Sequence, residues 1–422
     1  MDEGRRLEMN RNEQMDQLAK AAVERGVCVK PGQTVVIRGQ YEMIEMIRKV
    51  AEEAWKAGAK DVCVVCGDPV LDRLQYTHAS DEDLANPPAW MIDRLQQQAD
   101  EKAAFISLVG EDPDAMKGID PDRILRRSLA MRTKADRYRA GIDNGTLAWT
   151  VIPVPTVAWA KKVFPDLEDD QAMDRMWDDM IQICRAEGDV DRNWDEHTKD
   201  LQRKCEKLNG RNFRKFHLTS SNGTDLWVDM PEGAQFCGGA TQLEDGRFIN
   251  CNMPTEELFS APSRTGVNGT LEAVLPLSWN GQMINGFGFT FKDGEVVDYH
   301  ADEGYESLGA LLDSDPNGRR LGEIAFVDKK TPIRQMGRIY FNTLIDENAA
   351  CHFAFGQSYG ETMKGAQGMS SEELEVKGMN QSAIHVDFMV GAEDLNIDGI
   401  TADGTSVPVF RDGSFTAEFS GE

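Results

Sequence analysis

The sequence has few cysteines, few histidines and no long apolar run, and each shortage excludes a class of protein. Its 422 residues include eight cysteines, too few for a disulfide-rich scaffold, so we expect reduced thiols and a cytoplasmic location. The least polar stretch, TLAWTVIPVPTVAWA from Thr146, is too short to cross a bilayer and contains two prolines. We therefore expect no membrane segment and no export.

Positive charge is also scarce. Lys and Arg number 46 against 72 Asp and Glu, which gives a formal net charge of −26. Since binding to a phosphate backbone requires clustered cations, nucleic acid is not an expected partner. The motifs HExxH, GxxxxGK[ST] and GxGxxG are absent, so a zinc-binding helix, a P-loop and a dinucleotide-binding turn are not indicated.

The first half of the chain alternates between strand and helix patterns. Apolar runs at TVVIR from Thr34, DVCVV from Asp61 and AAFISLVG from Ala103 predict strands. Between the first two, YEMIEMIRKVAEEAWKAG from Tyr41 has apolar residues at helical spacing and ends in a glycine. This alternation predicts an α/β N-terminal domain, residues 1–205, with a mostly parallel sheet. The acidic stretch 166–209 is expected to be helical, with Met176, Trp177 and Met180 in its buried stripe.

Beyond residue 210 the pattern changes to short strands separated by turn dipeptides. All five Asp-Gly pairs of the chain lie there, beginning at residues 245, 293, 398, 403 and 412. Asn-Gly pairs that begin at residues 222, 268, 280 and 285 lie between the same apolar runs. Such dipeptides between apolar runs are typical of β-hairpins. We therefore predict that residues 206–422 form a mainly antiparallel β domain.

Two of the six histidines lie in stretches with unusual polarity. In SAIHVDFMV, residues 382–390, alternation places His385 and Asp387 on one face of a strand, roughly 7 Å apart along the backbone. The pair could be two metal ligands on one rigid strand. A hydrogen-bonded His–Asp pair on a half-buried sheet face is the alternative for these two residues taken alone.

The second stretch, LIDENAACHFAFG at residues 344–356, places Glu347 and His352 among small and apolar residues. A buried charge is costly unless it is paired or binds a metal. Asp346 or Asn348 could instead cap a helix that begins here, with Glu347 as a favourable charge in its first turn. Further carboxylates lie beside apolar residues at Glu256, Glu257 and Glu323, and only one of the adjacent pair can face a given site. Oxygen ligands with a few imidazoles suit two divalent ions such as zinc, cobalt or manganese.

Taken in order, four segments resemble the motif series of the aminopeptidase T family of dinuclear metallopeptidases. They are NMPTEELFSAP, LGEIAFV, NTLIDENAACHFAFGQSYG and NQSAIHVDFMVGAEDLNIDG, and the likeness extends upstream to VKPGQTVVI, PTVAWA and GTDLWV. The resemblance covers nearly the whole chain. One departure is Asn268, where the family is expected to have an acid more often.

The resemblance implies a set of site residues in the C-terminal domain. The expected metal ligands are Glu257, Glu323, Glu347, His352, His385 and Asp387. Glu323 would bridge the two ions, and Tyr359 would face the substrate and could stabilise the oxyanion. In the motif series of the family, the spacing to Glu323 favours Glu257 over Glu256 as the ligand. Glu256 is then a candidate for a catalytic role outside the metal ligands.

The function implied by this resemblance is removal of the N-terminal residue from peptides by a water that two metal ions activate. A homodimer and a peptide substrate with a free amino terminus are also expected. Two other functions remain open. A mononuclear iron dioxygenase that cleaves dihydroxypyridine rings could use His352, His385 and Asp387, although it has no use for three further glutamates. A non-catalytic scaffold is the third possibility.

Overall fold

The computed structural model describes residues 9–279, 282–366 and 369–420, which fold into two compact units. Unit 1 extends to His197 and also includes Ala240–Thr255 and Arg338–Leu344. Unit 2 consists of Thr198–Gly239, Glu256–Gly337 and the chain from Ile345 onward. The change of pattern predicts a single boundary near residue 205, whereas the chain returns to unit 1 twice.

Both returning segments are held by contacts that no local sequence pattern encodes. Asn252 pairs in parallel with Val151, whose amide donates to the carbonyl of Cys251 at 2.8 Å. In the other segment, Arg338 and Tyr340 bind the buried carboxylate of Asp179 at 2.7 and 2.9 Å. Burial raises the pKa of Asp179, and the charge of Arg338 opposes that rise.

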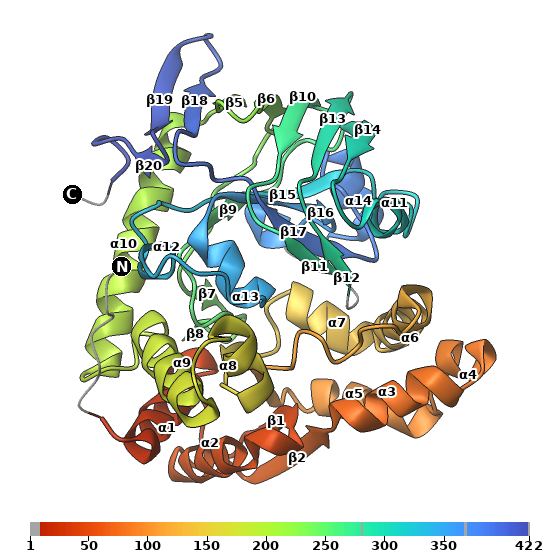
Figure 1. Cartoon of the computed structure of the whole chain (residues 1–422). Coiled ribbons are helices and arrows are strands. Elements are labelled where there is room, and N and C mark those ends of the chain that lie inside the picture. The colour runs from red at the N-terminus through yellow and green to blue at the C-terminus, as the bar shows by residue number, and fades with distance from the viewer. Residues whose placement is uncertain (1–8, 280–281, 367–368, 421–422) are drawn as a thin grey trace. The chain divides into compact units, whose positions relative to one another are not determined.

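Unit 1 is built on a four-stranded sheet in the order β2-β1-β3-β4, in which all neighbours are parallel. Strands β1 and β2 of this sheet are labelled in Figure 1. Its strands are β1 (Thr34–Gln40), β2 (Asp61–Gly67), β3 (Ala104–Val109) and β4 (Trp149–Pro153). The first three lie where the apolar runs predicted them. A short hairpin, β7 (Thr241–Gln242) and β8 (Phe248–Ile249), turns at Asp245-Gly246.

Helices connect the strands of unit 1. They are α1 (Arg11–Lys20), α2 (Ile44–Lys56), α3 (Pro69–His78), α4 (Asp81–Ala85), α5 (Ala89–Asp100), α6 (Pro121–Lys134), α7 (Asp136–Asp143), α8 (Val157–Val163), α9 (Asp169–Ile183) and α10 (Val190–Arg211), which continues into unit 2. The predicted stripe of α9 is buried at Met176, Trp177 and Met180. The predicted α/β architecture with a parallel sheet is therefore present.

Unit 2 contains an eight-stranded antiparallel sheet in the order β14-β13-β10-β6-β5-β18-β19-β20. Its strands are β5 (Lys215–Thr219), β6 (Asp225–Asp229), β10 (Val267–Glu272), β13 (Gly288–Lys292), β14 (Glu295–His300), β18 (Asn396–Ile400), β19 (Ser406–Arg411) and β20 (Ser414–Phe415). A separate hairpin pairs β11 (Leu277–Trp279) with β12 (Gln282–Ile284).

Most of the turn dipeptides do connect hairpin strands. Asp293-Gly294 joins β13 to β14 and Asp412-Gly413 joins β19 to β20, with positive φ at both residues of each pair. Three dipeptides were interpreted wrongly. Asn268-Gly269 lies within β10, Asp398-Gly399 lies within β18, and Asn285-Gly286 connects β12 to β13, which belong to different sheets. Glycine is required at 269 because a side chain there would meet the carbonyl of Asp225. Asn280-Gly281 lies outside the described residues.

A second, four-stranded antiparallel sheet in unit 2 has the order β17-β16-β15-β9. Its strands are β9 (Leu258–Ser260), β15 (Leu321–Phe326), β16 (His352–Gly356) and β17 (His385–Met389). The helices of unit 2 are α11 (Tyr305–Leu312), α12 (Pro332–Gln335), α13 (Thr343–Asp346), which begins in unit 1, and α14 (Ser371–Val376).

Aromatic side chains cover one face of the four-stranded sheet. Phe388 of β17 lies 4.8 Å from Phe355 of β16 and 5.2 Å from Phe289 of β13, measured between ring centroids. These rings are almost fully buried and pack tightly, as protein interiors do. The apolar face therefore holds the strands rigidly, and the opposite face is left for other side chains.

No helix in the ranges that the structure describes is long and apolar enough to cross a membrane.

The packing of the aromatic face predicts that Phe388→Ala destabilises the protein by about 3–5 kcal/mol, because it leaves a cavity between rings. Urea unfolding followed by aromatic circular dichroism measures the loss. As a control, Val297→Ala on exposed strand β14 should change the free energy of unfolding by no more than about 0.5 kcal/mol. Equal effects of the two substitutions would contradict the role assigned to the aromatic face.

Candidate metal centre

The four-stranded sheet of unit 2 collects acidic and imidazole side chains on the face opposite its aromatic core. His385 and Asp387 lie on β17, His352 on β16 and Glu323 on β15, while Glu257 directly precedes β9. Glu323, Ala354 and Asp387 are cross-strand neighbours in one row, so their side chains share a face. His352 is two residues from Ala354 and therefore shares that face too.

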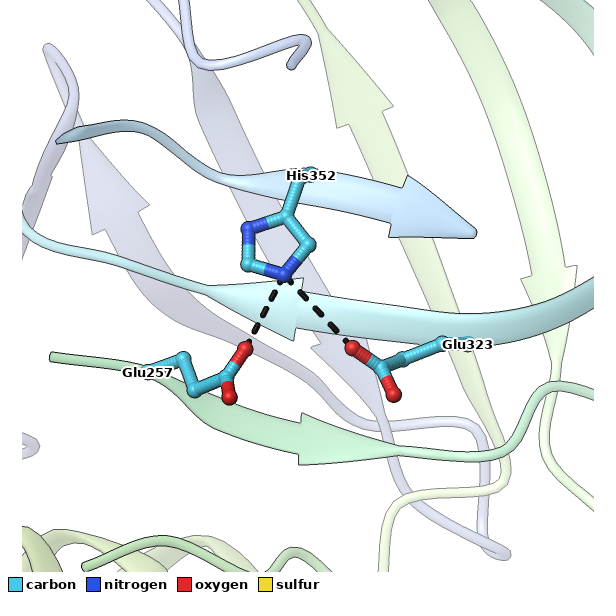
Figure 2. Close-up of side chains that lie close together, drawn as sticks. All are labelled: Glu257, Glu323 and His352. Carbon is cyan, nitrogen blue, oxygen red and sulfur yellow. Dashed lines mark ion pairs between the residues drawn. The ribbon is translucent and has the colours of Figure 1, made fainter. Parts of the chain in front are cut away.

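The first cluster joins Glu257, Glu323 and His352. Figure 2 shows both carboxylates directed at the same ring nitrogen of His352. His352 Nε2 lies 3.0 Å from Glu257 Oε2 and 3.5 Å from Glu323 Oε1. Among the residues that the structure describes, Nε2 of His352 is a buried polar atom without a hydrogen-bond partner, although both carboxylates lie within ion-pair distance.

The second cluster joins Glu323, His385 and Asp387. His385 Nε2 lies 3.4 Å from Asp387 Oδ1 and 3.8 Å from Glu323 Oε2. Glu323 therefore belongs to both clusters and directs a different oxygen to each histidine. Within each cluster the three possible ligand atoms lie within 4.8 Å of one another.

Backbone carbonyls orient both imidazole rings. His352 Nδ1 lies 3.1 Å from the carbonyl of Ala350, and His385 Nδ1 lies 2.8 Å from that of Gln357. Since a carbonyl only accepts hydrogen bonds, each Nδ1 must be the donor. The Nε2 atoms that face the acids are thus available as ligands, an arrangement usual for metal-binding histidines.

Burial makes this group of acids electrostatically unusual. Glu257, Glu323 and Glu347 are 8%, 5% and 7% exposed, and His352 is 1% exposed. Burial, followed by the charges of Asp387 and Glu257, raises the pKa of Glu347 well above its ordinary value. Burial opposes protonation of His385, yet Asp387 and Glu323 raise its pKa to about 9. The site thus attracts positive charge strongly.

The structure places Glu347 differently from the other five predicted ligands. It lies on a 3₁₀ turn, Glu347–Ala349, and joins neither cluster in the part of the chain that the structure describes. Its carboxyl is nevertheless close enough to feel the charges of Asp387, Glu257, His352 and Glu323. The expectation that Asn348 caps a helix was wrong, because its side chain accepts from the amide of Glu256 at 2.6 Å.

The remaining predicted site residues, Tyr359 and Glu256, border the clusters. The ring of Tyr359 packs on that of His385, with 4.7 Å between centroids, and Tyr359 is partly exposed. Glu256 is buried and precedes Glu257, whose carboxylate contacts His352. The structure therefore brings Glu257, not its neighbour, into the first cluster.

Sequence reasoning missed two features of the site. Ala354 separates Glu323 from Asp387 in the row, and its methyl group leaves the space between the carboxylates open. Ala354 is two residues after His352 in the sequence, and strand alternation from His352 could have shown that it shares the face of the acids. The second feature is Asn348, which contacts both Glu256 and Glu347. The sequence could not indicate its contact with Glu256, because the two residues are 92 positions apart.

The sequence also contains Gly-x-Ser-x-Gly at residues 356–360, which sequence reasoning missed and which resembles the nucleophile motif of serine hydrolases. The hydroxyl of Ser358 is buried, donates to the carbonyl of Gly322 at 2.9 Å and accepts from the amide of Asn380 at 3.2 Å. This serine fixes a loop and is not placed as a nucleophile.

The donor set fits divalent cations well. Imidazole and carboxylate together suit zinc, cobalt or manganese, and the buried Nε2 of His352 without a hydrogen bond has the lone pair such an ion needs. The mononuclear iron alternative fits less well, because His352 and His385 fall in different clusters of the described residues.

Comparison with known proteins agrees with this geometry. The sequence model of the thermophilic metalloprotease (M29) family matches residues 11–415. Aminopeptidase 2 of Geobacillus stearothermophilus is 40% identical over 98% of this chain and 100% of its own length. The solved structure of wild-type AmpT from Thermus thermophilus has a TM-score of 0.88 at 35% identity and covers 96% of this chain and 100% of that one.

A more distant likeness concerns fold alone. The structure of a 2,5-dihydroxypyridine dioxygenase from Pseudomonas putida KT2440 has a TM-score of 0.50 at 12% identity, over 96% of each chain. Similarity at that level shows a related fold and says nothing about the chemistry of this chain.

The small side chain of Ala354, between Glu323 and Asp387, leads to a testable prediction about metal binding. Ala354→Leu should weaken metal binding about tenfold or more, since overpacking costs ~1–3 kcal/mol and the added atoms lie between Glu323 and Asp387. Titration with cobalt, followed by metal analysis after dialysis, measures the change. Phe353→Leu on the opposite face of the same strand is the control and should lose stability without losing metal. Unchanged affinity in Ala354→Leu would disprove the prediction.

Proposed function

We infer that this chain, which belongs to the thermophilic metalloprotease (M29) family, is a metallo-aminopeptidase that hydrolyses the N-terminal peptide bond of its substrates. The family match spans almost the entire chain, and the curated relatives named as aminopeptidases are covered nearly end to end. The metal clusters of unit 2 supply a site suited to such chemistry.

The proposed cofactor is a pair of divalent cations, zinc, cobalt or manganese, held in unit 2. The observation that supports two ions best is that Glu323 directs one oxygen to each histidine cluster. We assign Glu257 and His352 to one ion, His385 and Asp387 to the other, and Glu323 to both. Glu347 completes the ligands. The four carboxylates then carry as much negative charge as two divalent cations carry positive charge.

When bound, two such ions lower the pKa of a water and polarise the peptide carbonyl. The residues of the chain position and stabilise the reacting groups. Carbonyls of Ala350 and Gln357 lock the imidazoles in one tautomer. Tyr359, packed on His385, is proposed to donate a hydrogen bond to the oxyanion of the tetrahedral intermediate. Glu256, buried beside Glu257, is proposed to hold or transfer a proton during the reaction.

The proposed substrate is a peptide with a free amino terminus. A free amino group could ligate a metal ion at the site, whereas a blocked terminus could not, and this difference would restrict cleavage to the first residue. A homodimer is proposed from the family resemblance. A cytoplasmic location is proposed from the eight cysteines, all of which are free thiols.

The first experiment is metal analysis of the protein purified without oxygen, together with a panel of aminoacyl and dipeptide substrates. About two divalent ions per chain are expected, with release of the N-terminal residue that a chelator abolishes and re-added zinc, cobalt or manganese restores. Chelation should also lower the melting temperature, since an ion present at 100 times its Kd contributes ~2.7 kcal/mol.

N-acetylated versions of the same peptides are the matched control and should not be cleaved. The aminopeptidase assignment is wrong if the protein holds one iron per chain, cleaves no peptide and consumes oxygen with a hydroxylated pyridine. An intact fold with no bound metal under any condition would instead favour a scaffold role.

A substitution tests the bridging role of Glu323. Glu323→Gln should reduce turnover by about two orders of magnitude or more, because the residue shared by both clusters loses its charge. Circular dichroism should show an unchanged fold. Glu393→Gln, which removes an exposed carboxylate paired with Arg334 at 2.7 Å, is the control for loss of one charge and should retain activity. Retained activity in Glu323→Gln would rule out bridging.

A further inference from the structure

Asn348 is a fully buried amide whose two ends contact both acidic segments that flank the histidine clusters. Its Oδ1 accepts from the backbone amide of Glu256 at 2.6 Å, and its Nδ2 donates to Glu347 Oε1 at 3.4 Å. It is 0% exposed, so its side chain is shielded from bulk water. The backbone carbonyl of Asn348 is held in turn by the hydroxyl of Thr331 at 3.3 Å.

These contacts lie where the chain enters unit 2. Glu256 is the first residue of one entering segment, and Ile345 begins another, three residues before Asn348. No strand pairing fixes Glu256 or Glu347, since β9 begins at Leu258 and β16 at His352. The sheet register therefore positions Glu323, His352, His385 and Asp387. The segments of Glu257 and Glu347 lie outside the strands and are positioned by other contacts, among them those of Asn348.

An amide is the group this position requires. Glu256 presents an N–H donor and Glu347 a carboxylate acceptor, so the residue between them must accept on one side and donate on the other. Aspartate would lack the donor and would add a negative charge beside a carboxyl that already feels Asp387, Glu257 and Glu323. Alanine would leave both partners buried without this hydrogen bond, which is costly.

We propose that Asn348 is a positioning residue of the metal centre: its amide holds Glu347 directed at the clusters and fixes the backbone that presents Glu257. The inference rests on the proposed two-metal function and deepens it, because it explains how Glu347, which lies outside both clusters, is kept oriented as a ligand. Asn348 itself touches neither substrate nor ion.

The test compares metal binding by wild type, Asn348→Ala and Asn348→Ser. The apoprotein is titrated with Co²⁺, and the visible absorption of bound cobalt is recorded with the number and affinity of ions. Loss of a residue that orients metal ligands typically costs 10–100-fold in affinity, so we expect one ion to bind that much more weakly and the cobalt spectrum to change. Serine retains a hydroxyl but is too short to span both partners, and it provides a second variant if alanine prevents folding.

A double-mutant cycle separates positioning from general stability. If Asn348 acts through Glu347, then Asn348→Ala should lower cobalt affinity much less in a Glu347→Gln background than in wild type. The control is Asn209→Ala. Asn209 makes the same two-sided bond, accepting from the amide of Phe236 at 2.7 Å and donating to its carbonyl at 2.9 Å, and it contacts none of the predicted ligands. This control should lose stability while keeping both ions and the cobalt spectrum.

The outcomes distinguish this inference from the proposed function. Wild type with two cobalt ions and peptidase activity, together with unchanged affinity and spectrum in folded Asn348→Ala or Asn348→Ser, would overturn the positioning role alone. Equal losses in Asn348→Ala and Asn209→Ala would also overturn it, since they would indicate a purely structural effect. Wild type that binds no second ion would overturn both the proposed function and this inference.

Discussion

The structure of unit 2 depends on the cost of burying four carboxylates close together. Glu257, Glu323, Glu347 and Asp387 act on one another electrostatically, and burial raises the pKa of Glu323 and Glu347. Without cations, protons must offset this charge, both on the glutamates, whose raised pKa favours the neutral form, and on the histidines, since the nearby acids raise the pKa of His352 and of His385. Divalent ions would replace those protons with more charge and with directed bonds, so the site is stable only when occupied by positive charge.

The sheet lowers the cost of assembling such a site. Adjacent strands lie about 4.8 Å apart, so ligands on β15, β16 and β17 are brought to contact distance by backbone hydrogen bonds alone. The aromatic face then prevents the strands from moving apart in response to repulsion between acids. The small side chain of Ala354 keeps this face open, because a larger one would fill the space between Glu323 and Asp387. One face therefore supplies rigidity while the other supplies chemistry.

Local patterns predicted the parts of the fold that local physics determines. Alternation in residues 382–390 correctly placed His385 and Asp387 on one face of a strand, because the side-chain period of a strand is fixed. Asp293-Gly294 was recognisable as a turn because a tight hairpin requires positive φ, which Asp and Gly tolerate. Asp398-Gly399 was wrongly predicted as a turn. It lies within β18, where a side chain at residue 399 would collide with the ring of Phe213. The return of residues 240–255 and 338–344 to unit 1, and the contact between Asn348 and Glu256, arise from tertiary packing and have no local signal.

The proposed ligands differ in how firmly the fold holds them. Glu323, His352, His385 and Asp387 lie on paired strands and can shift only if the sheet deforms. Glu347 lies on a single 3₁₀ turn and is held by a long hydrogen bond from Asn348. As a proposed ligand, Glu347 would therefore depend on a side-chain contact for its orientation, whereas the sheet itself orients the four residues on paired strands. If two ions are bound as proposed, the sheet would keep four of their ligands in place while the negative charge around the ions changes during each turnover.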